Sequence, residues 1–112
     1  MTRTFDSGAN RNDDTNKLDY EAFLSPLVLK RYVQYLHKHR YLEDGTIRCG
    51  DNWQKGMPLS SYMKSLMRHF MDVWLTHRGW YVEAKITDSL CGIIFNAMGM
   101  LHEIEKEKEN GS

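Results

Sequence analysis

The sequence contains little cysteine and little proline, with two residues of each among 112. Cys49 lies in a polar segment and Cys91 in an apolar one, and two cysteines do not make the disulfide framework of a small secreted protein. No second pair of cysteines offers the spacing of a zinc site. We therefore expect free thiols in a reducing compartment.

Long apolar runs and an excess of charge of one sign are also missing. No segment approaches the roughly 18 apolar residues that indicate a membrane span, and Met1 to Asn10 lacks the apolar centre of a signal peptide. The formal net charge is zero, without the basic excess of general nucleic-acid or membrane-surface binding proteins. These absences favour a cytoplasmic protein that binds small molecules or proteins, with no membrane contact and no direct nucleic-acid contact.

The patterns that are present predict a small helical protein. Residues 1–18 are rich in Gly, Asn, Asp and Thr and predict an irregular arm, either disordered or docked. Residues 19–107 predict a single helical domain, and residues 108–112 a frayed tail. The expected fold is all-α, a compact bundle of three main helices with a polar loop before the central one. A domain this small buries a limited share of its surface, so we also expect an oligomer.

Three stretches carry the helical patterns. A Ser-Pro start predicts a helix over residues 26–40. A central helix over residues 58–78 has apolar residues at three- and four-residue steps. Thr87 is a suitable cap for a third helix over residues 88–106, which is apolar nearly all round in residues 90–101. Such a helix belongs at the centre of the core or at a subunit interface.

Polar candidates for a site lie in the loop before the central helix and on the helices themselves. The loop contains Trp53, which either stacks on a flat ring or plugs the core beneath it, and the two roles are compatible. On the central helix, Arg68, His69 and Asp72 are three or four residues apart, so their side chains can touch. These polar residues form either one pocket or a set of ordinary features, such as a solvated ion pair.

The third helix adds two further polar candidates. Asp88 and Asn96 lie two turns apart on one face. Asp88 can also be a first-turn acid that the helix dipole favours, and Asn96 a buried amide with a structural hydrogen bond. The spacing alone leaves both interpretations open.

Five segments carry a family resemblance: FDSGANRN, KLDYEAFLSPLVLKRY, NWQKGM, LMRHFMDVW and FNAMGMLHE. Together, from about Phe5 to Glu103, they resemble the small phage proteins described as dATP/dGTP diphosphohydrolase (N-terminal-type) domains. These are grouped with the MazG-like all-α nucleoside triphosphate pyrophosphohydrolases. The resemblance implies a homo-oligomeric enzyme that converts dATP or dGTP to the monophosphate and pyrophosphate, in the cytoplasm of an infected bacterial host.

The resemblance also implies roles for the polar candidates. Hydrolysis at the α-phosphate needs divalent cations, Mg²⁺ or Mn²⁺, which carboxylates hold. Asp72 and Asp88 are the candidate ligands, with Asp19 as a possible third, and His69 is a candidate base or phosphate ligand. The candidates for substrate binding are Lys17, Lys55 and Arg68 for phosphate, and Asn52, Trp53 and Asn96 for the purine base.

The acidic residues leave other interpretations open. The best-known MazG-type enzymes carry Glu-Glu-x-x-Glu on one helix and Glu-x-x-Asp on the next, whereas the central helix here offers only Asp72. A chain with the pocket but without the acidic cluster would bind nucleotides without hydrolysing them, as a phage anti-defence sponge that sequesters a host nucleotide signal. A third hypothesis is a helical interaction module with no small-molecule site.

Overall fold

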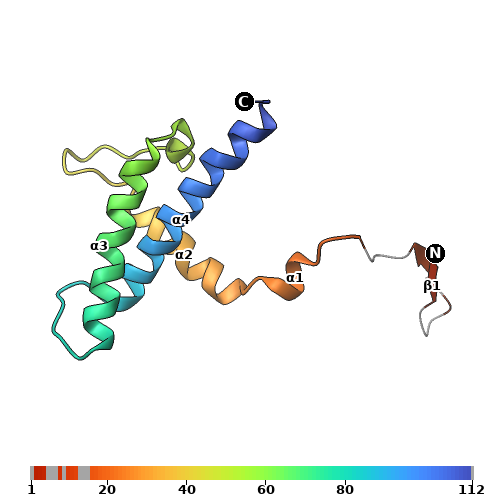
Figure 1. Cartoon of the computed structure of the whole chain (residues 1–112), viewed down its shortest axis with the longest axis horizontal. Coiled ribbons are helices and arrows are strands. Elements are labelled where there is room, and N and C mark those ends of the chain that lie inside the picture. The colour runs from red at the N-terminus through yellow and green to blue at the C-terminus, as the bar shows by residue number, and fades with distance from the viewer. Residues whose placement is uncertain (1, 5–7, 9, 13–15, 112) are drawn as a thin grey trace.

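The structure is a computed structural model that describes residues 2–4, 8, 10–12 and 16–111. The described chain is mostly helical, which confirms the predicted all-α class (Figure 1). No helix in these residues combines the length and the apolar character needed to cross a bilayer. The elements are β1 (Thr2–Thr4), β2 (Asn10–Asn12), α1 (Tyr20–Phe23), α2 (Pro26–Lys38), the 3₁₀ helix η1 (Asn52–Lys55), α3 (Leu59–His77) and α4 (Ile86–Glu109).

Helices α3 and α4 run antiparallel and form the main layer of the molecule (Figure 1). Two glycines of α4 make their close approach possible. A Cβ atom on Gly92 would lie 2.6 Å from Nε2 of His69, and one on Gly99 would overlap the ring of Tyr62. Tyr62 and His69 are seven residues apart on α3, and Gly92 and Gly99 are seven residues apart on α4. The two aromatic rings therefore lie over the same row of α4, called here the glycine ridge. Tyr62, with 0 % of its surface exposed, marks the centre of this packing.

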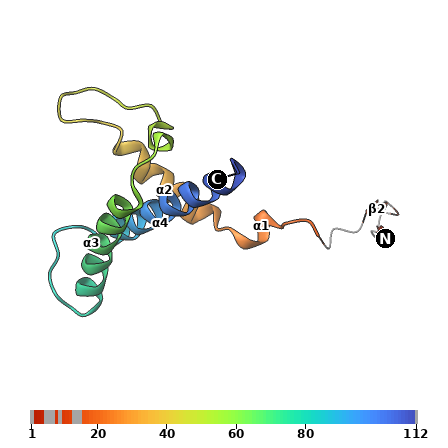
Figure 2. The same cartoon turned by 45° about the horizontal axis from the view of Figure 1, so that its top comes forward.

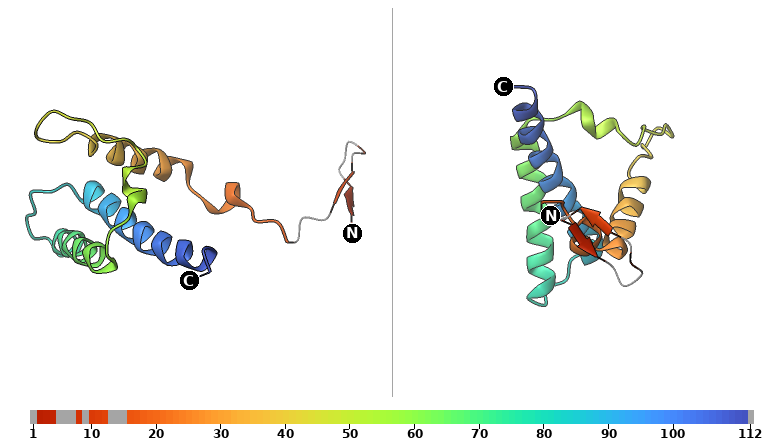
Figure 3. Two further views of the ribbon diagram at one scale, coloured as in Figure 1. Left: turned by 90° about the horizontal axis from the view of Figure 1, so that it is seen from above. Right: turned by 90° about the vertical axis from the view of Figure 1, so that its right-hand side faces the viewer.

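Helix α2 and the loop that follows it lie on one side of the α3–α4 layer (Figure 3, right). The hydroxyl of Tyr32 on α2 donates to Sδ of Met98 on α4 at 3.5 Å. Arg31 of α2 reaches Asp88 at the start of α4. Tyr32 is buried here together with Cys91. The side chains of α4 that meet α2 therefore lie on a different face from the glycine ridge that meets α3.

The bounds of α2 and α3 agree with the sequence patterns to within two residues. Ser25 caps α2, because its Oγ accepts a hydrogen bond from the backbone N–H of Val28 at 3.2 Å. Pro58 directly precedes α3. The chain turns away after α3 at Gly79, whose φ of 91° is one that other residues rarely adopt. The residues that predicted where these helices begin and end thus lie at the helix ends in the structure.

Helix α4 is longer than the predicted span of residues 88–106. It begins at Ile86 and ends at Glu109. Its start lies before the predicted threonine cap and has no side-chain cap of its own. At the other end, ion pairs one turn apart, such as Lys106 to Glu103 at 3.1 Å, support the charged segment as helix.

The N-terminal region contains regular structure that the sequence did not indicate. Strands β1 and β2 pair antiparallel, with Thr2 opposite Asn12, where an irregular arm was expected. Strand pairing is made by main-chain hydrogen bonds, so it needs no apolar period in the sequence. The chain then passes through α1 and leads from the β pair to the helical body (Figures 1 and 2).

The segment between α2 and α3 is a loop with one isolated bridge, which decides between the hairpin and loop alternatives. Tyr41 and Ile47 form the bridge. Asp44 closes the turn between them by accepting hydrogen bonds from the backbone N–H and the hydroxyl of Thr46, at 3.0 and 2.6 Å. The loop then enters η1, which carries its polar side chains toward α3 and α4.

Candidate functional site

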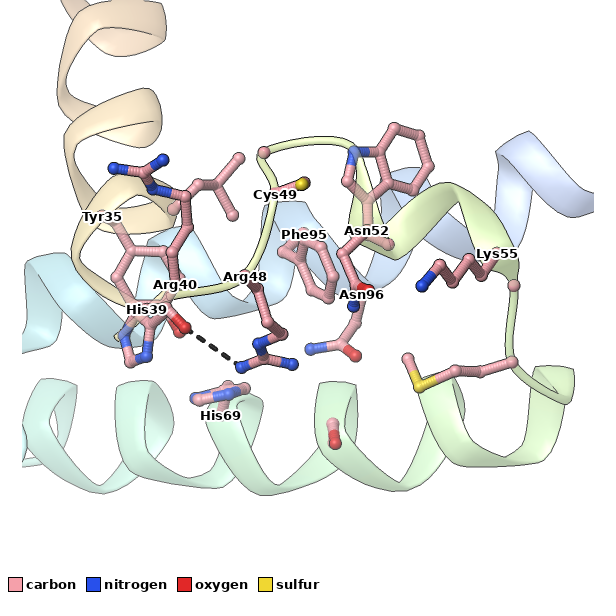
Figure 4. A pocket seen from close by; sticks show the side chains of 16 residues that line it. Tyr35, His39, Arg40, Arg48, Cys49, Asn52, Lys55, His69, Phe95 and Asn96 are labelled. Atoms are coloured by element: carbon pink, nitrogen blue, oxygen red, sulfur yellow. Dashed lines mark hydrogen bonds between the residues drawn. The ribbon is translucent and has the colours of Figure 1, made fainter. Parts of the chain in front are cut away.

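A pocket of about 550 Å³ lies between the end of α2, the loop before α3, and the adjoining faces of α3 and α4. Figure 4 shows side chains from all four segments gathered around it. His69 and Asn96 line it from the two helices of the main layer, and residues 48–57 of the loop form much of its wall. Its volume is within the range of small-molecule sites in proteins.

Three permanent cations line this pocket: Arg40, Arg48 and Lys55. Arg48 donates to the backbone carbonyl of His39 at 3.0 Å (dashed line in Figure 4), and Arg40 donates to that of His37 at 3.3 Å. Within the described part of the chain, none of the three cations forms a salt bridge. No aspartate or glutamate among the described residues lines the pocket either. The pocket therefore carries positive charge that its own lining does not neutralise.

Two histidines line the pocket beside these cations. The imidazole of His69 packs over the bare backbone of Gly92, which holds the ring at the pocket floor. Partial burial lowers the pKa of His39, and the charges of Lys38 and His69 lower it further. In Figure 4 both rings lie on the same side of the pocket as the guanidinium of Arg48. An anion bound beside His39 would oppose this lowering of its pKa.

Aromatic rings and amides complete the lining. Trp53 meets His102 edge to face, with ring centroids 4.7 Å apart at 69°, so the indole packs onto α4 as well as lining the pocket. The amide nitrogen of Asn96 donates to the carbonyl of Gly92 at 2.7 Å, which satisfies one side of this buried residue. The structural hydrogen bond considered for Asn96 is observed, and Trp53 packs on α4 but is only partly buried.

The structure divides the residues that the sequence singled out into two groups. Those that line the pocket are Asn52, Trp53, Lys55, His69 and Asn96. Those that do not line it are Lys17, Asp19, Arg68, Asp72 and Asp88. Arg68 is exposed and donates to the hydroxyl of Ser65 at 2.9 Å instead. The catalytic and binding roles that the resemblance implies for both groups stay predictions.

Several lining residues were not singled out from the sequence, among them Tyr35, His39, Arg40, Arg48 and Phe95. A signal was available for the two arginines. They flank the Asp44-Gly45 turn, and the backbone N–H of Arg48 donates to the carbonyl of Arg40 at 2.9 Å. A turn prediction at that dipeptide therefore brings the backbones of the two arginines together. No local spacing connects them to His69, because that proximity comes from how α2 packs on the layer.

Two of the three carboxylates proposed as metal ligands, those of Asp88 and Asp19, have other partners. Asp88 accepts from Nη2 of Arg31 at 2.5 Å and, through its second oxygen, from Nζ of Lys38 at 3.1 Å. Asp19 caps α1 by accepting from the backbone N–H of Ala22 at 3.0 Å. Within the described residues, no three His, Cys, Asp or Glu side chains are grouped to hold a metal ion. The residues as placed do not form the Mg²⁺ or Mn²⁺ ligand set that the resemblance implies.

The Asp88 ion pairs predict a pH dependence of stability. The hydrogen bond from Arg31 lowers the pKa of Asp88 from its ordinary value of 3.8, against the opposing effect of partial burial, and Lys38 lowers it further. A lowered pKa stabilises the fold at pH values above 3.8, and this contribution is lost as the pH falls through the folded-state value. Asp88→Asn should cost roughly 1 kcal/mol at pH 7, since the pair is partly exposed.

Urea unfolding of wild type and Asp88→Asn at pH 7 and at pH 3 tests this prediction. The difference in unfolding free energy should narrow at the lower pH, because the wild-type carboxylate is then becoming protonated. An equal difference at both pH values would show that the ion pairs are not its source.

Comparisons of this chain with models of known protein families, with curated proteins and with solved structures found no match. The family resemblance seen in the sequence segments therefore stays a prediction. The function proposed below is drawn from the pocket residues.

Proposed function

We propose that the pocket binds a nucleotide through its phosphate groups and does not itself supply the metal site for hydrolysis. The main observation that supports this proposal is the charge of the side chains that line the pocket. Among the described residues, the pocket is lined by the cations Arg40, Arg48 and Lys55, by the imidazoles of His39 and His69, and by no carboxylate. Charge-assisted hydrogen bonds from such groups to phosphate oxygens are among the stronger polar contacts in proteins. A concave surface with this charge favours an anion over a neutral or cationic ligand.

The aromatic part of the lining supports a ligand that also carries a flat ring. Tyr35, Trp53 and Phe95 contribute rings, and Asn52 contributes an amide that can hydrogen-bond to a base edge. A few polar groups set among aromatic side chains are typical of sites for ring-bearing small molecules. A purine nucleotide has both chemical parts, a flat base and a phosphate chain.

The side chains that line the pocket favour binding of a nucleotide over its hydrolysis. The lining holds phosphate-binding groups and no carboxylate, while Asp88 is engaged by Arg31 and Lys38 on another part of α4. Binding of phosphate by arginine, lysine and histidine needs no bridging cation. Nucleotide binding without hydrolysis is the sponge-type alternative that the sequence left open. Pyrophosphohydrolysis of dATP or dGTP, which the resemblance implies, is tested by the same experiment.

Calorimetric titration of the protein with dATP and with dGTP in EDTA tests the proposal, with deoxyadenosine as the matched ligand without phosphate. We expect binding of a deoxynucleotide in the chelator. Deoxyadenosine should bind at least about tenfold more weakly, because one charge-assisted hydrogen bond contributes about 1.5–3 kcal/mol. No binding of either nucleotide, or equal binding of the nucleoside, would contradict the assignment of the pocket to phosphate.

A second arm separates binding from hydrolysis. The protein is incubated with each deoxynucleotide and Mg²⁺ or Mn²⁺, and pyrophosphate release is followed by ion-exchange chromatography. We expect the nucleotide to be recovered intact. Release that disappears on chelation and in Asp72→Asn would establish the enzyme and contradict the binding-only proposal.

A further inference from the structure

Four nitrogen-bearing side chains lie at one end of the pocket, called here the arginine end. They are His39, Arg40, Arg48 and His69, which come from the residues after α2, from the loop and from α3. In Figure 4 the two imidazole rings lie on the same side of the pocket as the guanidinium of Arg48, and Lys55 lies on the other side. Nitrogen groups from three segments of the chain therefore surround one part of the pocket.

Two contacts fix the position of His39 at this end. Its backbone carbonyl accepts a hydrogen bond from Nη2 of Arg48 at 3.0 Å. Its ring packs on that of Tyr35, with ring centroids 4.3 Å apart and an angle of 56° between the planes. The residue is nevertheless exposed, so its imidazole exchanges protons directly with solvent. His39 is thus held beside a permanent cation and is free to change its protonation state.

The groups around this imidazole come from every neighbouring element. The titratable and charged side chains are Tyr35 and Lys38 of α2, Arg40 and Arg48 of the loop, His69 of α3 and Asp88 of α4. Asp88 already pairs with two basic side chains of α2. The positive groups near His39 therefore leave room for an anion from outside the chain.

These surroundings decide the charge of His39 when no anion is bound. Partial burial, followed by the charge of Lys38, holds the pKa of His39 below its ordinary value of 6.5, against a smaller opposing effect of Asp88. The imidazole is then neutral at pH 7 and offers one N–H donor. A phosphate placed beside the ring reverses the balance, because an opposite charge at short distance favours the imidazolium form.

We propose that His39 takes up a proton when the phosphate end of a nucleotide binds at the arginine end, so that the pocket prefers a terminal phosphate dianion and binds it more tightly as the pH falls. This inference rests on the proposed function, because it concerns the same pocket and the same ligand. The proton comes from solvent and returns to it when the nucleotide leaves. The imidazole gains one positive charge and a second N–H donor, and no bond in the nucleotide is made or broken.

The coupling distinguishes two classes of nucleotide. A terminal phosphate carries nearly two negative charges at pH 7.5, because its second pKa is about 6, whereas the phosphodiester of a cyclic nucleotide carries one. The dianion favours protonation of His39 more strongly, because the attraction grows with the charge. We therefore expect dAMP to bind about threefold or more tightly than its 3′,5′-cyclic form, with a larger uptake of protons.

Calorimetric titration with dATP in EDTA at pH 7.5, in two buffers of different ionisation enthalpy, counts the protons. The ligand is almost fully ionised at this pH, so any net uptake comes from the protein. We expect about half a proton or more for each nucleotide bound. By linkage, the affinity should then rise about threefold or more between pH 8 and pH 7.

The variant His39→Gln should lose most of the uptake, and His77→Gln is its matched control. His77 is exposed at the end of α3 and does not line the pocket, so this variant should take up as many protons as wild type. Uptake that is unchanged in His39→Gln would overturn the assignment to this residue. Equal affinity for dAMP and its cyclic form would overturn the preference for a dianion.

The wild type alone covers the case in which His39→Gln does not fold. Nucleotide binding without proton uptake, and with an affinity that stays constant between pH 8 and pH 6.5, would overturn this inference and leave the proposed function standing. An absence of nucleotide binding over the same pH range would instead overturn the proposed function, and this inference with it.

Discussion

Arg48→Glu should weaken deoxynucleotide binding about 100-fold or more while leaving the protein folded. The variant removes a charge-assisted hydrogen bond worth about 1.5–3 kcal/mol and places a carboxylate near the phosphates, and 1.4 kcal/mol is already tenfold in affinity. The fold should tolerate the change, since within the described residues the side chain of Arg48 hydrogen-bonds to the exposed carbonyl of His39 alone, while its backbone hydrogen bond to Arg40 is kept. Calorimetric titration in EDTA, with circular dichroism of each variant, measures both effects.

The matched control for this charge reversal is Arg78→Glu. Arg78 is exposed at the end of α3 and does not line the pocket. Its reversal changes the net charge by the same amount, so it reports any general electrostatic effect, which should be small at 0.15 M salt. Equal losses in the two variants would mean that overall charge, and not the pocket, attracts the nucleotide. Unchanged affinity in Arg48→Glu would remove the pocket from consideration.

Gly99→Ala should destabilise the protein by about 2 kcal/mol, although alanine is the better helix former. Its methyl group would overlap the ring of Tyr62, which is 0 % exposed. Overpacking of this kind costs about 1–3 kcal/mol, and we expect the upper part of that range. The gain of up to about 1 kcal/mol in helix propensity offsets only part of it.

Thermal unfolding at one fixed protein concentration measures this effect, and the midpoint should fall by roughly 5–15 °C. The matched control is Gly50→Ala, because a methyl group at Gly50 would meet no other atom within 4 Å and the backbone there does not need positive φ. We expect the control to change the midpoint by no more than a few degrees. A Gly99→Ala variant as stable as wild type would show that the two helices do not pack through this ridge.

The helices were predictable because their signals are local. The Ser25-Pro26 start, Pro58 and Gly79 each act on the few residues beside them, and the structure places helix ends at these points. The beginning of α4 was misplaced by two residues because a threonine that suits a cap was interpreted as the cap. Nothing in the neighbouring residues distinguishes a capping threonine from one in the first turn.

The candidate site was predictable in part. His69, Asn96 and Lys55 were singled out as polar groups on an apolar helix or in a glycine-bounded loop, and they do line one pocket. Their convergence with Arg40 and Arg48 depends on the position of α2 across the layer, which no spacing in the sequence reports. Asp88 shows the opposite case. It lies in the first turn of α4, as one of its two interpretations predicted, but its partners, Arg31 and Lys38, come from α2 and were not predicted.

The floor of the pocket, at His69 and the glycine ridge, and its wall differ in the chain entropy that is lost when each forms. The floor is made by α3 and α4, which are joined by the short connector of residues 78–85, so bringing them together closes only a small loop. The wall comes from residues 35–57, which must close much longer loops to reach α4. A substitution in the wall therefore changes contacts with the ligand and leaves the packing of α3 on α4 unchanged. One at His69 alters the packing of the two helices as well as the site.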